Sequence, residues 1–370
     1  NTLSFAFGNN SQAKGKSSYA LGSYSKAIGH GSFAMGYYEE EFVNFASNPT
    51  IAYGPFSFAL GIGALAYDTA SIAIGVNARA SGMLSTAFGF EARATGYNSL
   101  AFGGSAQANG DNSMAIGFSS TAEGTNSFAL GTGSSASATL AFSVGNNANT
   151  GNKFSYSFGN IINNNGENSF AMGTNITINE GATGSFAVGN NVGVGLAAEN
   201  SFTMGNNITN NSKGSFVFGD ATNSTSAYAI DDNSFVVRSS GGVKIYTSKD
   251  YDAGINISSG GSSWNTFSDK NKKENYTKLD SEDIYKKLLQ LPVERWNYKA
   301  QSPDIMHIGT YAQDFYRLFQ VGESNLTITW IDPVGVNTIA IQHQAKIIEK
   351  QQQEIEALRK QIQEIKELIK

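Results

Sequence analysis

The chain has 370 residues, enough for two or three domains, and it contains 25 Lys and Arg, 30 Asp and Glu and no cysteine. The lack of cysteine excludes a disulfide framework, a thiolate metal site and a cysteine nucleophile, and the mildly acidic balance argues against a nucleic-acid-binding surface. No apolar run reaches the length of about 18 residues that a membrane-spanning helix needs, so we expect no such helix.

Charge is distributed unevenly along the chain. Residues 1–245 contain 9 Lys and Arg and 13 Asp and Glu, whereas the remaining 125 residues contain 16 and 17. This contrast predicts two regions of different character. Because the chain starts at Asn1 inside a patterned segment, with neither a methionine nor a signal peptide, we expect it to be a fragment of a longer protein.

The first region is an internal repeat. A pentad such as SFAFG (4–8) or SFALG (127–131) occurs fifteen times, spaced by 14 residues almost throughout and by 16 at two steps near the end. A weaker Ala-x-Ala motif, as at Ala78 and Ala80, lies between the pentads. Alternating small and large residues predict strands, the closing glycine permits a turn, and the fixed period predicts a solenoid. We therefore expect a parallel β-roll with two short strands per turn over residues 1–219.

So thin a roll cannot bury both its ladder of large residues and its ladder of alanines. We expect its second apolar face to be buried against copies of the same chain. The alternation of Ser-x-Ala-x-Gly with Ala-x-Ala-x-Gly resembles the YadA-like head of trimeric autotransporter adhesins. That resemblance implies a left-handed parallel β-roll that assembles as a homotrimer and mediates surface attachment.

One insertion, YYEEEFVNFASNPTIAYGPF (37–56), interrupts the repeat. The simpler interpretation is a tolerated surface loop. The functional alternative is a side platform in which Tyr37, Tyr38 and Glu39–Glu41 contact a receptor or a glycan. Because adjacent glutamates cannot all face one substrate, catalysis by paired carboxylates is a weak hypothesis here.

Residues 220–267 leave the repeat and are expected to form a β connector. The segment SFVVRSSGGVKIYTS (234–248) predicts a hairpin that turns at Gly241 and Gly242. The Gly/Ser-rich stretch 258–263 predicts a flexible approach to the phrase WNTFSDKNKKEN (264–275).

The last hundred residues follow a different pattern. The segment 281–291 predicts a helix capped by Ser281 and stopped by Pro292. Residues 308–319 predict a second helix with one apolar face, and ERWNYKA (294–300) and LTITWIDP (326–333) predict strands. Residues 268–370 therefore read as a small α+β domain.

From about residue 338 to residue 370 the sequence predicts a coiled coil. Isoleucine recurs every seven residues on one core position, and Leu358 and Ile365 fall on the other. Isoleucine at both core positions favours three or more strands over two. The predicted interface residues are Ile341, Ile348, Ile355, Leu358, Ile362, Ile365 and Ile369.

Residues 268–370 also resemble the intramolecular chaperone domain of phage endosialidases and other tail spikes and fibres. The segments SDKNKKEN (268–275), ERWNYK (294–299) and HIGTYAQDF (307–315), together with the terminal coiled coil, carry the resemblance. It implies that the domain trimerises, guides the folding of the fibre before it and then cuts itself off.

The same resemblance assigns roles within SDKNKKEN. Ser268 matches the family nucleophile and Lys273 the family general base, and Asp269 and Asn275 are candidate supporting residues. The expected scissile bond joins Phe267 to Ser268, with Ser268–Asp269 as the less favoured alternative. Two positions depart from the family pattern: Lys270 replaces an arginine, and Thr310 replaces a proline. Without the resemblance, a solvated lysine-rich turn would be the preferred interpretation.

We expect no metal and no cofactor. The three histidines, His30, His307 and His343, lack the spacing of a metal site, and no Gly-x-Gly string has the strand-then-helix context of a nucleotide site. The expected partners are two further copies of the chain and a cell-surface receptor or glycan, not nucleic acid.

Three functional hypotheses remain. The first is a self-cleaving trimeric fibre protein, located in a virion tail fibre or on a bacterial surface. The second is a surface adhesin whose chaperone-like domain trimerises without cutting. The third, a glycan-degrading tail spike, is disfavoured because almost no acidic residue recurs at a strand position.

Overall fold

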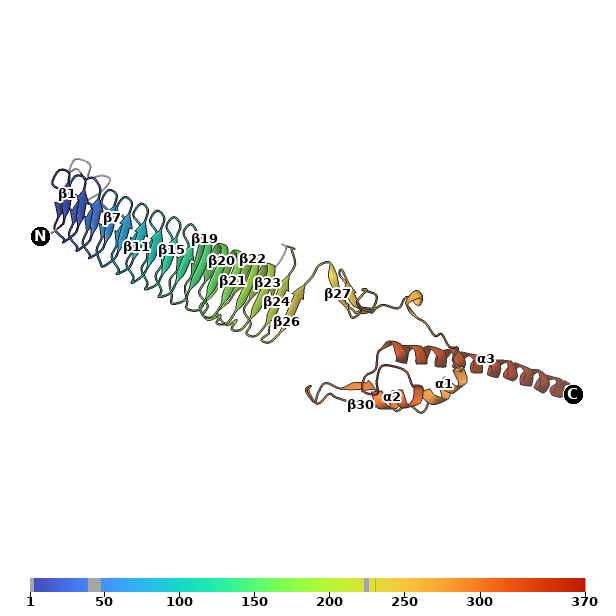
Figure 1. Cartoon of the computed structure of the whole chain (residues 1–370). Helices are drawn as coiled ribbons and strands as arrows, with labels where there is room; N and C mark the ends of the chain where they lie inside the picture. The colour runs from blue at the N-terminus through green and yellow to red at the C-terminus, as the bar shows by residue number, and fades with distance from the viewer. Residues whose placement is uncertain (1–2, 39–47, 223–225, 230, 370) are drawn as a thin grey trace. The chain divides into compact units, whose positions relative to one another are not determined.

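The computed structural model describes residues 3–38, 48–222, 226–229 and 231–369 (Figure 1). The chain divides into two compact units, Asn1–Phe267 and Ser268–Lys370. Each unit is described by itself. Glu39–Glu41 of the predicted side platform lie outside the described residues.

The first unit is dominated by one large parallel sheet whose strands stack turn upon turn (Figure 1). Up to residue 136 each turn has two short strands. The three-residue strands contain the centres of the pentads and are β1 (Phe5–Phe7), β3 (Tyr19–Leu21), β5 (Phe33–Met35), β7 (Phe58–Leu60), β9 (Ile72–Ile74), β11 (Thr86–Phe88), β13 (Leu100–Phe102), β15 (Met114–Ile116) and β17 (Phe128–Leu130). The two-residue strands are β2 (Gln12–Ala13), β4 (Lys26–Ala27), β6 (Ile51–Ala52), β8 (Leu65–Ala66), β10 (Arg79–Ala80), β12 (Arg93–Ala94), β14 (Gln107–Ala108), β16 (Thr121–Ala122) and β18 (Ser135–Ala136).

Farther along, the two strands of a turn join into one. These nine-residue strands are β19 (Phe142–Thr150), β20 (Tyr156–Asn164), β21 (Phe170–Ile178), β22 (Phe186–Val194) and β23 (Phe202–Asn210). The predicted pair of short strands per turn is therefore correct for the earlier turns and incomplete for the later ones. Strands β24 (Phe216–Gly219), β25 (Ala227–Tyr228) and β26 (Phe235–Arg238) end the sheet.

The register of the sheet places like residues on like residues. Phe88 pairs with Phe102 and Ala87 with Ala101, one repeat of 14 residues apart. The insertion leaves the ladder intact, because Phe33 pairs directly with Phe58 across it. The mainly β solenoid predicted from the period is thus confirmed.

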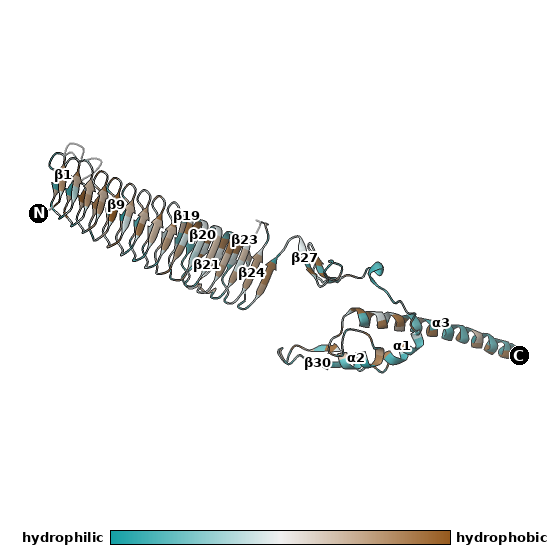
Figure 2. Ribbon diagram, in the orientation of Figure 1, coloured by the Kyte–Doolittle hydropathy of each residue, from teal (hydrophilic) through white to brown (hydrophobic). Residues whose placement is uncertain are grey.

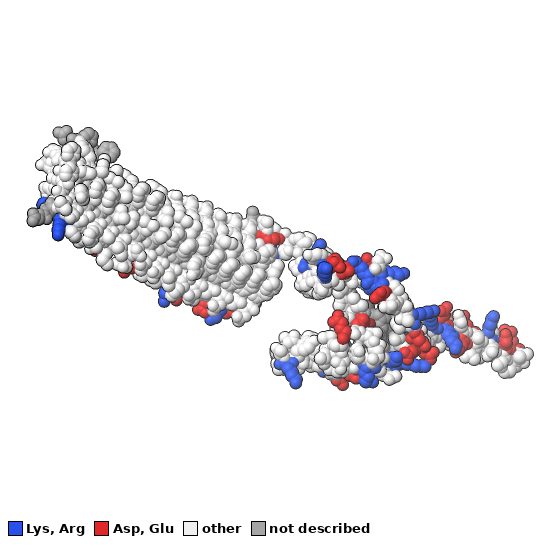
Figure 3. Space-filling view, in the orientation of Figure 1, with Lys and Arg blue, Asp and Glu red and all other residues white. Residues whose placement is uncertain are grey.

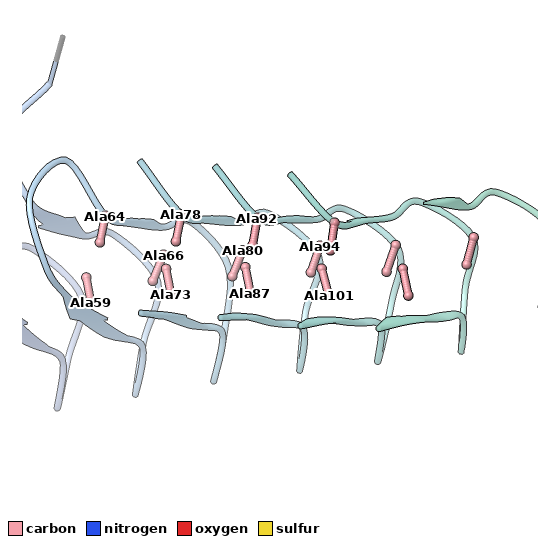
Figure 4. Close-up of a cluster of buried hydrophobic side chains, with 14 of the residues drawn as sticks. Ala59, Ala64, Ala66, Ala73, Ala78, Ala80, Ala87, Ala92, Ala94 and Ala101 are labelled. Atoms are coloured by element: carbon pink, nitrogen blue, oxygen red, sulfur yellow. The ribbon is translucent and has the colours of Figure 1, made fainter. Parts of the chain in front are cut away.

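The interior of the earlier turns is narrow and filled with alanine (Figure 4), whereas the later turns also bury larger residues such as Ile162 and Val192. Alanines of the short strands, such as Ala73, Ala80 and Ala87, are fully buried and point toward one another between the strands. The serine that opens most pentads also points inward: Ser85 is buried and its hydroxyl donates to the Gly82 carbonyl at 2.6 Å. The earlier turns require small residues inside because their two backbone layers approach closely. The large pentad residues therefore point outward, as the exposure of Phe88 and Phe102 shows. The strands that carry them are hydrophobic along the roll (Figure 2).

The corners of the roll explain its asparagine content. Many turns contain a residue with φ near +55°, the left-handed region that asparagine tolerates better than other side chains. The asparagines in this conformation within the first unit are Asn10, Asn77, Asn98, Asn112, Asn126, Asn147, Asn168, Asn175, Asn191, Asn200, Asn207 and Asn233.

The roll ends at a pair of charged side chains. Arg238 lies in register with Gly219 and donates from Nε to Asp220 Oδ1 at 3.3 Å. Hydrogen bonds from Ser240, followed by the backbone N–H of Thr222, hold the pKa of the Asp220 carboxyl well below its usual value of 3.8. The pair joins the last turn of the roll to the chain that leaves it.

The hairpin predicted over residues 234–248 is wrong. Its first half, β26, pairs in parallel with β24, and Phe235 stacks on Phe216 with 5.0 Å between ring centroids. Its second half, β27 (Gly242–Tyr246), pairs antiparallel with β28 (Gly254–Ser258), and β29 (Asn265–Thr266) adds to β28. The edge of the solenoid captures residues 235–238 because they continue its ladder of aromatic residues.

The second unit is a small α+β domain. It contains the 3₁₀ turn η2 (Lys270–Lys272), α1 (Ser281–Leu288), the antiparallel pair β30 (Glu294–Trp296) and β31 (His307–Gly309), α2 (Ala312–Phe319) and α3 (Ile331–Leu368). Its core consists of Ile284 of α1, Phe315, Leu318 and Phe319 of α2 and Val336 of α3.

Two local predictions for this unit need correction. The cap of α1 is Asp280 rather than Ser281: its carboxylate accepts from the Glu282 N–H at 2.9 Å, a position where the helix dipole favours negative charge. The predicted strand 326–333 does not form, and Ile331 begins α3 instead. Pro333 lies in the first turn of that helix, where its missing N–H breaks no hydrogen bond.

Candidate functional site

Ser268 and Lys273, the predicted nucleophile and base, lie side by side. The Lys273 ammonium Nζ donates to Ser268 Oγ at 2.7 Å, and both side chains are exposed in the single chain. A hydrogen bond of this length is what proton transfer from a serine hydroxyl to a lysine amine requires. The arrangement can therefore activate Ser268 whenever Lys273 is neutral.

A tight turn brings the two residues together. Asp269, a predicted supporting residue, caps η2 by accepting from the Asn271 N–H at 2.9 Å. The Lys273 N–H closes the turn on the Lys270 carbonyl at 3.2 Å. This single turn places the side chains of residues 268 and 273 on one side despite the four residues between them.

Tyr276 also holds this turn, and no sequence pattern pointed to it. Its hydroxyl lies 2.5 Å from the Lys270 carbonyl oxygen and 2.9 Å from the Lys273 carbonyl oxygen. The Lys270 ammonium lies 6.0 Å from the centre of its ring. Tyr276 thus fixes the backbone that carries Lys273.

Asn275, the other predicted supporting residue, is distinguished by its backbone conformation. Its φ of 57° places it in the left-handed region, which reverses the chain after Lys273. In the described part of the chain, no hydrogen bond joins its side chain to Ser268 or to Lys273.

The expected scissile bond lies at the boundary between the two units. The first unit ends at Phe267 and the second begins at Ser268. Phe267 follows the short strand β29, and its ring stacks on Tyr246 of β27 with 5.9 Å between centroids. Within the first unit, the residue on the amino side of the bond is thus held against a small sheet.

The predicted coiled-coil residues form an exposed apolar stripe on α3. The early part of the helix packs on its own domain through Val336 and Ala340, which are buried. Beyond them the stripe is uncovered, from 44% exposure at Ile355 to 80% at Ile369. The exposed side chains are those of all seven predicted residues, Ile341, Ile348, Ile355, Leu358, Ile362, Ile365 and Ile369.

The roll has an exposed apolar face of its own. The second and fourth residues of each pentad point to the same outer side of their strand, so that Phe88 and Phe102 are 42% and 48% exposed. The surface visible in Figure 3 carries few charged atoms over the roll and many over the second unit. The large residues of the pentads therefore form two outward ladders, one of which is interrupted by Thr86.

The remaining candidates have structural partners. Tyr38 packs edge-on against Tyr24 with 5.8 Å between centroids, and Tyr37 is about half exposed. His30 Nδ1 lies 2.9 Å from the Lys16 carbonyl, His307 Nε2 lies 2.9 Å from Gln301 Oε1, and His343 Nδ1 lies 3.2 Å from Ser281 Oγ. Among the described residues, no three His, Asp or Glu side chains gather as a metal would require.

Comparison with protein-family models finds two matches. The model of the YadA head domain repeat (2 copies) matches residues 2–25, 13–38, 52–78, 66–92, 80–106, 94–120, 108–134 and 122–148. The model described as the chaperone of endosialidase matches residues 268–321. No curated protein matches the chain. Both resemblances inferred from the motifs are thus confirmed, in the order head repeats and then chaperone domain.

The matched segments and the fold agree. The parallel sheet continues past residue 148, the end of the matched repeats, through β26. The chaperone match begins at Ser268, where the second unit begins. Within the described ranges, no helix is long and apolar enough to cross a membrane.

Proposed function

We propose that the chain is a homotrimeric fibre protein whose second unit drives assembly and then releases itself by cutting the Phe267–Ser268 bond. The hydrogen bond of 2.7 Å between Lys273 and Ser268 carries the proposal. The roll is the attachment head, presented to a surface receptor or glycan by a virion tail fibre or a bacterial surface. The matches to head repeats and to the endosialidase chaperone support this combination.

Two exposed apolar surfaces support the trimer. The isoleucine stripe of α3 has the heptad spacing that favours three strands. The outward ladders of the roll expose Phe, Leu, Ile and Met in almost every turn, an area that a monomer would leave in water. Burial of both surfaces between copies of the chain removes this exposure.

The chemistry follows from the place of Ser268 in the scissile bond. Its Oγ attacks the Phe267 carbonyl carbon through a five-membered ring while Lys273 accepts the hydroxyl proton. Collapse of the tetrahedral intermediate breaks the C–N bond, and the Ser268 nitrogen takes up the proton. The Phe267 acyl group is then an ester on Ser268 Oγ. Water hydrolyses this ester, leaving a carboxylate on Phe267 and a 103-residue fragment, 268–370.

The same chemistry makes cutting depend on assembly. A lysine side chain ordinarily titrates near 10.4 and acts as a base only in its neutral form. Burial and neighbouring positive charge favour the neutral form. Lys270 and Lys272 lie within the same turn and supply the charge, and the adjoining chains of a trimer supply the burial. Cutting would then follow trimer closure.

Mass spectrometry of freshly expressed and of aged protein tests this proposal. We expect the wild type to release the fragment 268–370, and Ser268→Ala and Lys273→Ala to remain uncut and trimeric. Lys273→Arg should also remain uncut, because arginine keeps the positive charge but cannot act as a base. Lys278→Ala, a matched change outside the turn, should cut normally.

Two outcomes would contradict parts of the proposal. An intact chain after prolonged incubation of a folded wild-type trimer would rule out self-cleavage and favour the non-cleaving adhesin. A monomer or dimer in sedimentation equilibrium would rule out the trimer. Release of polysaccharide fragments by the purified protein would instead indicate a glycan-degrading spike.

A further inference from the structure

The later turns of the roll carry an uncharged polar groove of about 240 Å³. It lies across strands β21, β22 and β23, on the outer side of their second halves. Three asparagines from the corners form one wall, and Thr177 and Thr209 form the other. The asparagines of the first wall are Asn175, Asn191 and Asn207.

The asparagine wall is held rigid by its own hydrogen bonds. Asn175 Nδ2 donates to Asn191 Oδ1 at 2.8 Å, and Asn191 Nδ2 donates to Asn207 Oδ1 at 2.9 Å. An amide has two N–H donors and an oxygen with two lone pairs. The ladder uses one donor each of Asn175 and Asn191 and one lone pair of the Asn191 oxygen, and Ser226 Oγ also donates to Asn207 Oδ1 at 3.3 Å. The second N–H donors of Asn175 and Asn191 are therefore not used by the ladder.

The floor of the groove is Gly193. This residue lies in the outward ladder of the roll, between Thr177 and Thr209, where other turns carry a side chain. A Cβ added there would meet only the Ile208 carbonyl oxygen at 3.8 Å and Thr209 Oγ1 at 3.9 Å, which are ordinary contacts. The backbone therefore does not require glycine at this position. The groove is open because residue 193 is a glycine and carries no side chain to fill it.

An aromatic ring stands at the end of the same ladder. Tyr228 pairs with Thr209 in the next turn and is 59% exposed. Its ring offers a flat apolar surface with a polar tip. In successive turns this ladder therefore presents the Thr177 hydroxyl, the open position at Gly193, the Thr209 hydroxyl and the Tyr228 ring. Neighbouring turns are about 4.8 Å apart, which is comparable to the width of a pyranose ring.

The chemistry of this surface selects its ligand. None of the described residues that line the groove is Lys, Arg, Asp or Glu. Without a cation in the groove, an anionic ligand would have to be desolvated without compensation. Amides and hydroxyls match the hydroxyl groups of a sugar, and an aromatic ring packs on the apolar face of a sugar ring.

We propose that this groove binds a neutral glycan chain that lies along the roll, with Gly193 as its floor and Tyr228 as its stacking platform. The proposal deepens the attachment role proposed for the head and rests on it. The apolar ladders of the pentads form the proposed trimer interface, whereas the groove lies on the second halves of the strands. Three grooves per trimer would add avidity to weak single contacts.

Binding of defined polysaccharides by the full-length chain tests the proposal. The probes are dextran, mannan and cello-oligosaccharides as neutral glycans, with hyaluronan and polysialic acid as anionic ones, measured by biolayer interferometry. We expect the wild type to bind at least one neutral probe. Gly193→Gln fills the groove and Tyr228→Ala removes the platform, and each should weaken that binding at least tenfold.

The matched control is Thr121→Gln. Thr121 occupies the equivalent position of an earlier turn, beside Gln107, so the roll accepts glutamine at this position. This variant should bind as the wild type does. Equal binding by Gly193→Gln and the wild type would overturn the proposal, and so would binding of anionic probes alone. A processed, trimeric wild type that binds no neutral probe would overturn the groove while leaving the fibre function intact.

Discussion

Replacing Gly173 by alanine should disrupt the roll. Gly173 closes its pentad with a φ of 137° and stacks between Gly159 and Gly189 of the neighbouring turns. A Cβ there would overlap the Gly189 carbonyl oxygen, which is backbone and cannot swing aside. The backbone conformation alone costs an L-residue about 1–3 kcal/mol. Separating the turns breaks two or three ladder hydrogen bonds, at about 1 kcal/mol each, so the total loss is about 3–6 kcal/mol per chain.

The matched control is Gly193→Ala, whose Cβ finds room. Because a processed fibre is expected to unfold irreversibly, the measurement is the unfolding rate in guanidinium, followed by circular dichroism. We expect Gly173→Ala to unfold at least a hundredfold faster or to be insoluble, and Gly193→Ala to behave as the wild type. Equal rates for the two variants would refute the reasoning that stacked backbone, and not composition, requires glycine at the end of the pentad.

Three further predictions follow from the structure. Ile161 is a β-branched residue with a φ of 54° in a corner where asparagine is common, so Ile161→Asn should stabilise the roll by about 1 kcal/mol per chain, measured as slower unfolding. The pKa of Asp220 is lowered by hydrogen bonds from Ser240, so its contribution to stability is complete above its usual pKa of 3.8 and is lost as the pH falls below it; Asp220→Asn should flatten this acid limb of a stability–pH curve. Replacing Ile355 and Ile362 by Asp would bury charges in the proposed coiled coil, so sedimentation should show loss of the trimer, and normal fibres would contradict the chaperone role.

The repeat could be predicted from the sequence because its period and its alternation carry the same information as the sheet register. Every Ala that stacks on an Ala in the structure lies 14 or 16 residues from it within the unbroken repeat, as Ala87 and Ala101 do. The role of asparagine at the corners of the roll was harder to predict from the sequence. An asparagine in a polar sequence has many explanations, and only the backbone shows that a positive φ selects it.

The mistaken hairpin shows where local pattern fails. Residues 234–248 contain two strand-like runs around paired glycines, which is a sound local signal for a hairpin. Tertiary contacts override this local preference, since the last strand of the solenoid offers parallel hydrogen bonds to residues 235–238 and an aromatic neighbour to Phe235. The segment SFVVR is also a pentad whose final glycine has become Arg238, and this substitution concealed the extra turn.

The candidate site was located by family resemblance, not by geometry. The spacing of Ser268 and Lys273 alone is compatible with an ordinary lysine-rich turn. The structure adds the 3₁₀ turn that brings the two side chains together and the Tyr276 hydroxyl that fixes it. This last contact could not be predicted, because it joins a side chain to backbone carbonyls and leaves no pattern of residue types.

The regularity of the roll creates the problem that a detachable second unit would solve. Like residues stack on like residues in turn after turn, so three chains could associate with one chain slipped by a whole repeat while keeping most apolar contacts. The features of the described roll that distinguish groups of turns are the insertion between Phe33 and Phe58, the change to nine-residue strands from β19 onward and the two 16-residue steps. Within each group, neighbouring turns are nearly alike. Residues 268–330 of the second unit have no repeat. This part of the unit would fix the register of its coiled coil and align the chains before the roll closes. Once it has been cut away, a trimer that opens cannot realign, and an aligned trimer remains kinetically trapped. If the second unit were cut off before assembly, the alignment of the chains would be lost. This is a physical reason why the proposed base, Lys273, should become active only after the three chains have associated.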